Sequence, residues 1–119
     1  TGLFDDLSLK DQITLLRDTL DNLGSIGLML DELQVAYLDR DLKRLQEISE
    51  ASMRAGDPQL AETFNRKIVL ERNHRMAERM QSRLREGRQF IAVGALHLAG
   101  EQGLLRLLSE RGYRLSRIY

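Results

Sequence analysis

The residue best suited to chemistry in this sequence is a histidine that follows an apolar run and lies among small residues. His97 stands within the segment 93–103, which also contains Gly94, Gly100 and Gly103. Glycine permits close approach and tight turns, and an imidazole beside such a turn is suited to binding a metal ion or transferring a proton. The alternative is that His97 caps the next helix or forms a hydrogen bond within a half-buried loop. The residue type leaves both interpretations open.

Three consecutive polar residues upstream interrupt an apolar helical stripe. Glu71, Arg72 and Asn73 place a carboxylate, a guanidinium and an amide near the boundary of the core. Burying such groups is costly unless they are paired or serve a site. Arg72 is able to anchor Glu71 or a substrate carboxylate through two hydrogen bonds, and Asn73 to orient either group. The alternative is a helix boundary at which Asn73 is the N-cap and the other two side chains are solvated.

The remaining polar residues of this region are interpreted as surface. Arg75, Arg79 and Arg83 recur along one helical face, a pattern that also occurs in proteins that bind phosphate or nucleic acid. Glutamates lie between them and no aromatic residue accompanies them, so we interpret the face as solvated and ion-paired. His74, beside these arginines, is also expected at the surface.

Composition narrows the chemistry further. The 119 residues fit one domain, and 18 basic side chains balance 18 acidic ones, so no net charge favours nucleic acid or an anionic membrane. The absence of cysteine excludes disulfides and thiolate chemistry but leaves the compartment open. No apolar run approaches the roughly 20 residues that span a bilayer. The sequence also lacks the motifs of phosphate-binding loops, His-Glu-x-x-His zinc proteases and serine hydrolases.

Apolar residues at steps of three and four predict that residues 1–88 are mainly helical. Ser8 and Asp57 stand where helix N-caps are expected, and either Asp39 or Asp41 can cap the third helix. Gly56 and Gly87 stand where helices are expected to stop. The predicted helices cover residues 9–23, 30–39, 42–55 and 58–86. The stripe of the first helix consists of Leu9, Ile13, Leu16, Leu20 and Leu23. The sequence does not decide whether the last range is one helix or two that meet at Asn73.

The pattern changes at Gln89, and residues 89–119 are predicted to form a strand-helix-strand unit. Residues 90–93 are a continuous apolar run of strand length, 101–111 a short helix, and 113–119 an alternating strand. Such strands run parallel through a right-handed crossover, but two strands alone seldom make a stable sheet. We therefore expect an α+β fold, mostly helical, in which the whole chain is a single unit within a larger α/β sheet domain.

Two blocks of this sequence together resemble the C-terminal half of the TraB/GumN family, which is also related to the Tiki proteases. The first block is residues 70–76, and the second is residues 90–103 followed by 111–113. Residues 36–42 resemble the segment that precedes these motifs, with Arg40 where family members often have glycine. The resemblance spans nearly the whole chain, and residues 90–103 carry its most specific part.

The resemblance implies a metal-dependent hydrolase, with peptides as the expected substrates. In the family pattern, two Gly-x-x-His motifs from opposite halves of the protein join a glutamate and an Arg-Asn element. Gly94 and His97 match the second motif, which makes His97 the expected ligand of a divalent metal ion of unknown identity. Glu71, Arg72 and Asn73 match the other element and are the expected catalytic residues. The first Gly-x-x-His motif does not occur in this chain.

Two hypotheses follow. In the first, the chain supplies one half of the site of a metal-dependent hydrolase or peptidase and is inactive in isolation. Its partner is then a missing N-terminal half or a second copy, and an unpaired sheet edge promotes self-association. In the second, it is a non-catalytic peptide-binding or regulatory module, which the link between the TraB name and the shutdown of peptide pheromones permits. The resemblance favours a periplasmic or exported location.

Overall fold

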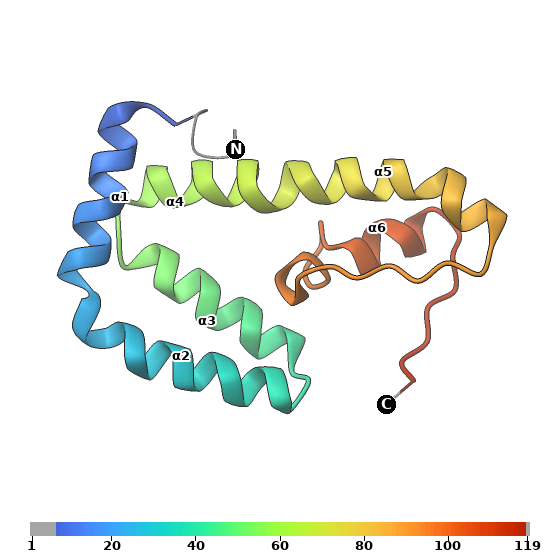
Figure 1. The fold of residues 1–119 in the computed structure, drawn as a ribbon, viewed down its shortest axis with the longest axis horizontal. Helices are drawn as coiled ribbons and strands as arrows, with labels where there is room; N and C mark the ends of the chain where they lie inside the picture. Colours follow the sequence, from blue (N-terminus) through green and yellow to red (C-terminus); the bar gives the residue numbers. More distant parts are fainter. Residues whose placement is uncertain (1–6, 119) are drawn as a thin grey trace.

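Helix is the only regular secondary structure in residues 7–118, the part of the chain that the computed structural model describes. A long rod crosses one side of the molecule, a helical hairpin lies beneath one end of it, and a short C-terminal helix lies beneath the other (Figure 1). In chain order the elements are α1 (Leu9–Asp21), α2 (Leu23–Leu38), α3 (Leu42–Arg54), α4 (Pro58–Phe64), the π-helix η1 (Asn65–Leu70), α5 (Glu71–Glu86), the 3-10 turn η2 (Ala95–His97) and α6 (Leu104–Glu110).

The N-caps predicted at Ser8 and Asp57 are confirmed, and of the two candidates for α3 the structure uses Asp41, whereas Asp39 is the C-cap of α2. The side chains of Ser8, Asp41 and Asp57 each accept a hydrogen bond from the backbone N–H three residues on, at 3.2, 2.9 and 2.9 Å respectively. Each bond satisfies a donor that the first turn of a helix otherwise leaves without a partner. Gly87 ends α5 with φ of 74°, whereas Gly56 is not among the glycines with positive φ and instead approaches the carboxylate of Asp18.

Arg40 adopts a left-handed backbone conformation in the turn between α2 and α3. It follows the C-cap of α2 and has φ of 58°, in the left-handed region that glycine adopts most readily. A glycine there would avoid the close contact between Cβ and the backbone. The arginine keeps the same turn at a steric cost.

Residues 58–86 form one continuous rod, which answers the question that the sequence left open. The rod is α-helical at both ends and π-helical over Asn65–Leu70, where the N–H of Glu71 bonds to the carbonyl of Arg66, five residues back. Segments of π-helix are frequent at functional sites. Asn73 is therefore not an N-cap, because it lies inside α5, three residues beyond the π segment.

Two small apolar clusters hold these elements together. Ala36, Leu45 and Ile48 pack between α2 and α3, and η2 reaches this cluster through Ala95. The second cluster joins α5 to α6 and consists of Ala77, Leu104 and Leu107, with Met76, Met80, Val93 and Leu98 packed around it. The loop that carries His97 is thus fixed from both sides.

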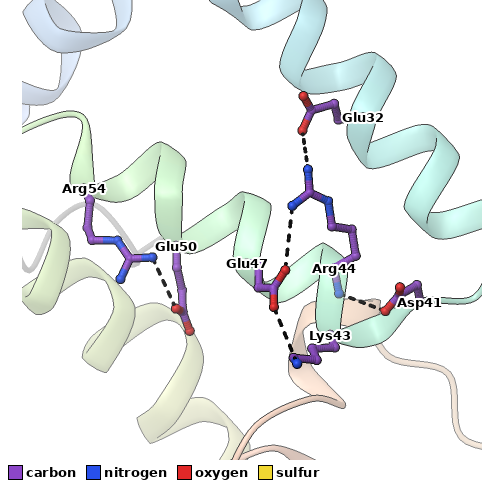
Figure 2. A network of polar contacts seen from close by, with 7 residues as sticks. All are labelled: Glu32, Asp41, Lys43, Arg44, Glu47, Glu50 and Arg54. Atoms are coloured by element: carbon purple, nitrogen blue, oxygen red, sulfur yellow. Dashed lines mark hydrogen bonds and ion pairs between the residues drawn. The ribbon is translucent and has the colours of Figure 1, made fainter.

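A chain of ion pairs runs along α3 and reaches across to α2 (Figure 2). Arg44 bridges Glu32 of α2 and Glu47 of its own helix at 3.1 and 3.7 Å, and Lys43 adds a contact of 3.9 Å to Glu47. All four side chains are about half exposed or more, so each pair contributes little to stability. The apolar cluster beneath them is the larger contribution to the hairpin.

The expected strand-helix-strand unit is wrong, and so is the α+β class. Residues 89–94 and 113–118 have no strand pairing, and Tyr119 lies outside the described residues. Phe90 is 94% exposed and Ile118 is 88% exposed, so neither segment is covered as a buried strand would be. A strand needs a neighbour for its backbone groups, and the described chain provides none for either segment. The self-association that we expected from a sheet edge therefore loses its structural basis.

The apolar stripe of α1 faces outward. Its members, Leu9, Ile13, Leu16 and Leu20, are between 50 and 73% exposed. The partly buried residues of α1 are instead mainly polar, namely Asp11, Thr14, Leu15 and Asp18. The periodicity therefore predicted the helix correctly but not the side on which it packs.

We expect the free energy of unfolding to depend on the face of α6 that packs against α5. Leu104 is 2% exposed and Leu105 is 40% exposed, although they are neighbours in the same helix. Leu104→Ala should cost about 2–5 kcal/mol, because it leaves a cavity between α5 and α6. Leu105→Ala is the matched control and should cost about 1 kcal/mol or less. Urea denaturation measures both, and equal losses would show that α6 does not pack on α5 as described.

Candidate functional site

Asn73 and His97, 24 residues apart in the sequence, meet in a hydrogen bond of 2.7 Å between Oδ1 of the amide and Nδ1 of the imidazole. The other end of the same amide donates from Nδ2 to the backbone carbonyl of Gln102 at 2.8 Å. Asn73 is 1% exposed, and both ends of its amide have a partner. This buried bridge ties α5 to the loop between η2 and α6.

The bridge fixes where the proton of His97 lies. The Gln102 carbonyl can only accept, so it is bonded to the NH2 group of Asn73 and leaves the amide oxygen for His97. That oxygen also only accepts, so Nδ1 of His97 must carry a hydrogen. In the neutral imidazole the lone pair is then on Nε2, the nitrogen that points away from the bridge. A histidine held in this way is suited to bind a metal ion or accept a proton through Nε2.

Two effects favour the neutral form of this imidazole. Burial lowers the pKa of His97 below the usual 6.5, and the positive charge of Arg72 lowers it further. Both disfavour the imidazolium ion, because the charged form loses hydration and is repelled by the guanidinium. Near neutral pH, the lone pair on Nε2 is therefore available.

The three residues of the Glu-Arg-Asn element point in different directions. Asn73 faces the loop and is buried, whereas Arg72 is exposed but close enough to His97 for its charge to act there. Glu71 is exposed and precedes Asn73 by two residues, which places it on the opposite side of α5. The structure thus brings Asn73 and Arg72 to His97 and leaves Glu71 away from it.

The glycines of the loop have unequal roles. Gly100 has φ of 84°, as expected for a turn residue, and lies against the side-chain amide of Gln46. Gly94 accepts the N–H of His97 through its carbonyl at 3.0 Å, and a Cβ there would meet the imidazole at an ordinary 3.6 Å. Gly103 is the most restricted, because a Cβ would overlap the backbone carbonyl oxygens of Leu98 and Ala99.

A cavity of about 250 Å³ opens beside Asn73. Its walls come from α3, the π-helix and the loop, and include Ser49, Val69, Leu96 and Gln102. A larger hollow of about 620 Å³ lies between α1, α2, α3 and α4, away from Asn73 and His97. The smaller cavity is the more relevant to chemistry, because it shares a wall with the bridge.

Sequence reasoning missed Gln102. Its backbone carbonyl orients Asn73, and its side-chain Oε1 lies 3.0 Å from Nε2 of His74, so the residue contacts two consecutive positions of α5. A backbone acceptor leaves no signal in residue type, although the side chain could have been noted within the motif. His74 is exposed, as expected, and has this glutamine as its partner.

Comparison with models of known protein families shows to which family this chain is related. A model of the TraB/PrgY/gumN family matches residues 1–117. This chain belongs to that family. Searches of curated proteins and of solved structures found no similar protein. The resemblance noted in the sequence is therefore confirmed at the level of family, and the bridge between Asn73 and His97 joins the two motif blocks of this TraB/PrgY/gumN chain.

The metal ion that the family resemblance implies can be tested against these residues. His97 fits as one ligand, because its Nδ1–H is held by an outer partner and its Nε2 is available, as in most histidines that bind metals. Across residues 7–118, no three histidine, aspartate or glutamate side chains gather into a metal site. The described residues of this TraB/PrgY/gumN chain thus supply a single imidazole for such an ion.

The pKa of His97 should respond to Arg72. We expect His97 to titrate below pH 6.5 and Arg72→Gln to raise its pKa, because a repulsive positive charge is removed. Arg85→Gln, at the far end of α5, should leave it unchanged. NMR titration of the imidazole measures all three, and a pKa at or above 6.5 in the unsubstituted chain would contradict the burial of His97.

The conformation of the loop that carries His97 should depend on the absence of a side chain at Gly103. Gly103→Ala should cost at least about 2 kcal/mol, because the methyl group displaces the carbonyls of Leu98 and Ala99 and with them the loop of His97. Gly24→Ala lies in α2 with open space around it and should stabilise the chain by up to about 1 kcal/mol. Thermal unfolding compares the two. Similar effects of the two substitutions would show that Gly103 is not restricted.

Proposed function

We propose that this chain provides one half of the active site of a metal-dependent hydrolase that acts on peptides. The observation that supports the proposal is the orientation of His97, whose Nδ1–H bonds to Asn73 and whose Nε2 therefore carries the lone pair that could bind a metal ion. Family membership is consistent with this activity but does not specify it. A divalent ion bound through His97 would polarise water and the scissile carbonyl.

The residues of this chain have separable parts in the proposed reaction. His97 would hold such an ion through Nε2, and Asn73 holds the ring in the tautomer and direction that this requires. Arg72 supplies positive charge beside the imidazole, suited to stabilising a carbonyl oxygen or a substrate carboxylate. A role for Glu71 as ligand or base would need a different arrangement, so the mechanism proposed here rests on the other three residues.

The proposal requires further polypeptide. A metal site takes three or four ligands, and His97 is one. We propose that the other ligands come from an additional segment of a longer protein or from a second copy of this chain, as the family pattern of two Gly-x-x-His motifs implies. The chain as given is then expected to be inactive in isolation.

Metal content and hydrolysis test the proposal in the longest natural polypeptide that contains this chain. His97→Ala should remove the bound ion and the activity. Asn73→Ala should weaken metal affinity about 10–100-fold, because it releases the ring from its outer partner. His74→Ala is the matched control and should retain both properties. Stoichiometric metal that persists without the imidazole of His97 would refute the proposal.

A second function, that of a non-catalytic peptide-binding module, is favoured by one observation. The hollow of about 620 Å³ between α1, α2, α3 and α4 is lined largely by apolar side chains, among them Ile26, Met29 and Phe64. A hydrophobic peptide segment is a suitable occupant. If this were the function, His97→Ala would leave the biological effect intact, whereas a charged residue at Met29 would remove it.

A further inference from the structure

The balanced net charge of this chain conceals a strong separation of charge. Residues 1–65 carry 13 acidic and 6 basic side chains, a net charge of −7, whereas residues 66–119 carry 12 basic and 5 acidic, a net charge of +7. Figure 1 places α1, α2 and α3 at one end of the molecule and α5 with α6 at the other. The longest dimension is 47 Å, several times the Debye length of about 8 Å at physiological salt. Each end therefore presents its own charge to a ligand.

A strip of arginines lies along α5 within the basic end. Arg72, Arg75 and Arg79 follow one another at steps of three and four residues, which puts them on one face of the helix. All three are exposed, and in the described part of the chain none of them has an ion pair. We had predicted that Arg75, Arg79 and Arg83 form an ion-paired face. Of these three, only Arg83 forms an ion pair in the described chain, at 3.9 Å from Glu86.

The acidic residues nearest the strip are Glu71 and Glu78 on α5 and Glu101 after the loop, and in the described part of the chain none of them forms an ion pair with it. The segment 87–100, which runs from the end of α5 to the turn after His97, contains no acidic residue, and the C-terminal segment 113–118 contains only basic charges. Like charges three and four residues apart destabilise a helix. An anionic ligand along this face relieves that repulsion as well as forming its own contacts.

The strip begins at the site described above. Arg72 is the member closest to His97, and its positive charge acts on that imidazole. Arg79 lies seven residues farther along α5, a distance of about 10 Å, which is about three residues of an extended peptide. A peptide that enters the site of His97 can thus place acidic side chains against the strip.

We propose that Arg72, Arg75 and Arg79 form a binding track for the acidic side chains of a peptide substrate beside His97. This inference rests on the proposed function in one respect, namely that the bound peptide is a substrate. The binding of acidic peptides itself does not depend on hydrolysis. A short acidic peptide fits better than an anionic bilayer or a nucleic acid. Both of these are extended polyanions that also meet the acidic end of the molecule, where residues 1–65 repel them.

Equilibrium binding tests the track without any turnover. The probe is a fluorescein-labelled peptide of alternating glutamate and serine, and its counterpart has glutamine in place of glutamate. By fluorescence anisotropy, the 119-residue chain should bind the glutamate peptide more tightly than the glutamine peptide, and less tightly as salt rises. The double variant Arg75→Gln/Arg79→Gln should weaken binding of the glutamate peptide about tenfold.

The matched control removes two charges elsewhere. Arg85 lies on another face of α5 and Arg17 lies on α1, and both are exposed, so Arg85→Gln/Arg17→Gln should leave the affinity within about twofold. Equal losses in the two double variants, or equal affinity for the two peptides, would overturn the proposal. Tighter binding to phosphatidylserine vesicles than to the peptide would assign the strip to a membrane instead.

Self-association is the remaining competitor, because the acidic end of a second copy is also a polyanion. Sedimentation at low salt should show a monomer, and a dimer that disappears in Arg75→Gln/Arg79→Gln would overturn the proposal.

The outcomes also separate this inference from the hydrolase. Peptide binding does not need metal, so a chain that binds acidic peptides but supports no hydrolysis contradicts only the proposed function. An active hydrolase that shows no preference for acidic peptides contradicts only the binding track.

Discussion

The buried amide of Asn73 is the interaction on which the site depends. An amide that is 1% exposed costs about 1–3 kcal/mol for each group left without a partner, so both of its ends must be satisfied. Here one end meets a backbone carbonyl and the other meets an imidazole. The same two bonds that make burial tolerable also select one tautomer of His97 and attach the loop to α5. Stability and chemistry are therefore supplied by one side chain.

Two apolar clusters hold the elements that this bridge connects. The α5–α6 cluster holds the elements that carry Asn73 and the loop, while Ala95 of η2 contacts the cluster between α2 and α3. His97 lies at the point where the two meet. A disturbance in either cluster consequently reaches the imidazole, even though neither cluster contains a residue that would touch a substrate. The surface ion pairs of the hairpin have no comparable influence, because they are exposed and screened.

The sequence predicted local features well and relative positions poorly. N-caps at Ser8 and Asp57 are encoded within four residues and were predicted correctly. The strands over 90–93 and 113–119 were wrong, because apolar runs and alternation describe covered, paired segments and the described chain does not pair them. For the candidate site, residue type and motif singled out His97 and Asn73, which the structure brings into contact, while their catalytic and metal-binding roles stay predictions. The carbonyl of Gln102 and the outward position of Glu71 were not, since both depend on which way a helix faces.

The π-helical segment in the middle of the rod sets the phase of everything that follows it. An α-helix turns by about 100° per residue and a π-helix by less, because its hydrogen bonds close over five residues instead of four, so rewinding Asn65–Leu70 as α-helix with all its residues kept would rotate α5 relative to α4. Leu60 and Phe64 would still face the hairpin, but Asn73 would swing away from the loop. The hydrogen-bond pattern of this short stretch therefore decides which face of α5 meets the loop, independently of the identity of the residues that fill it.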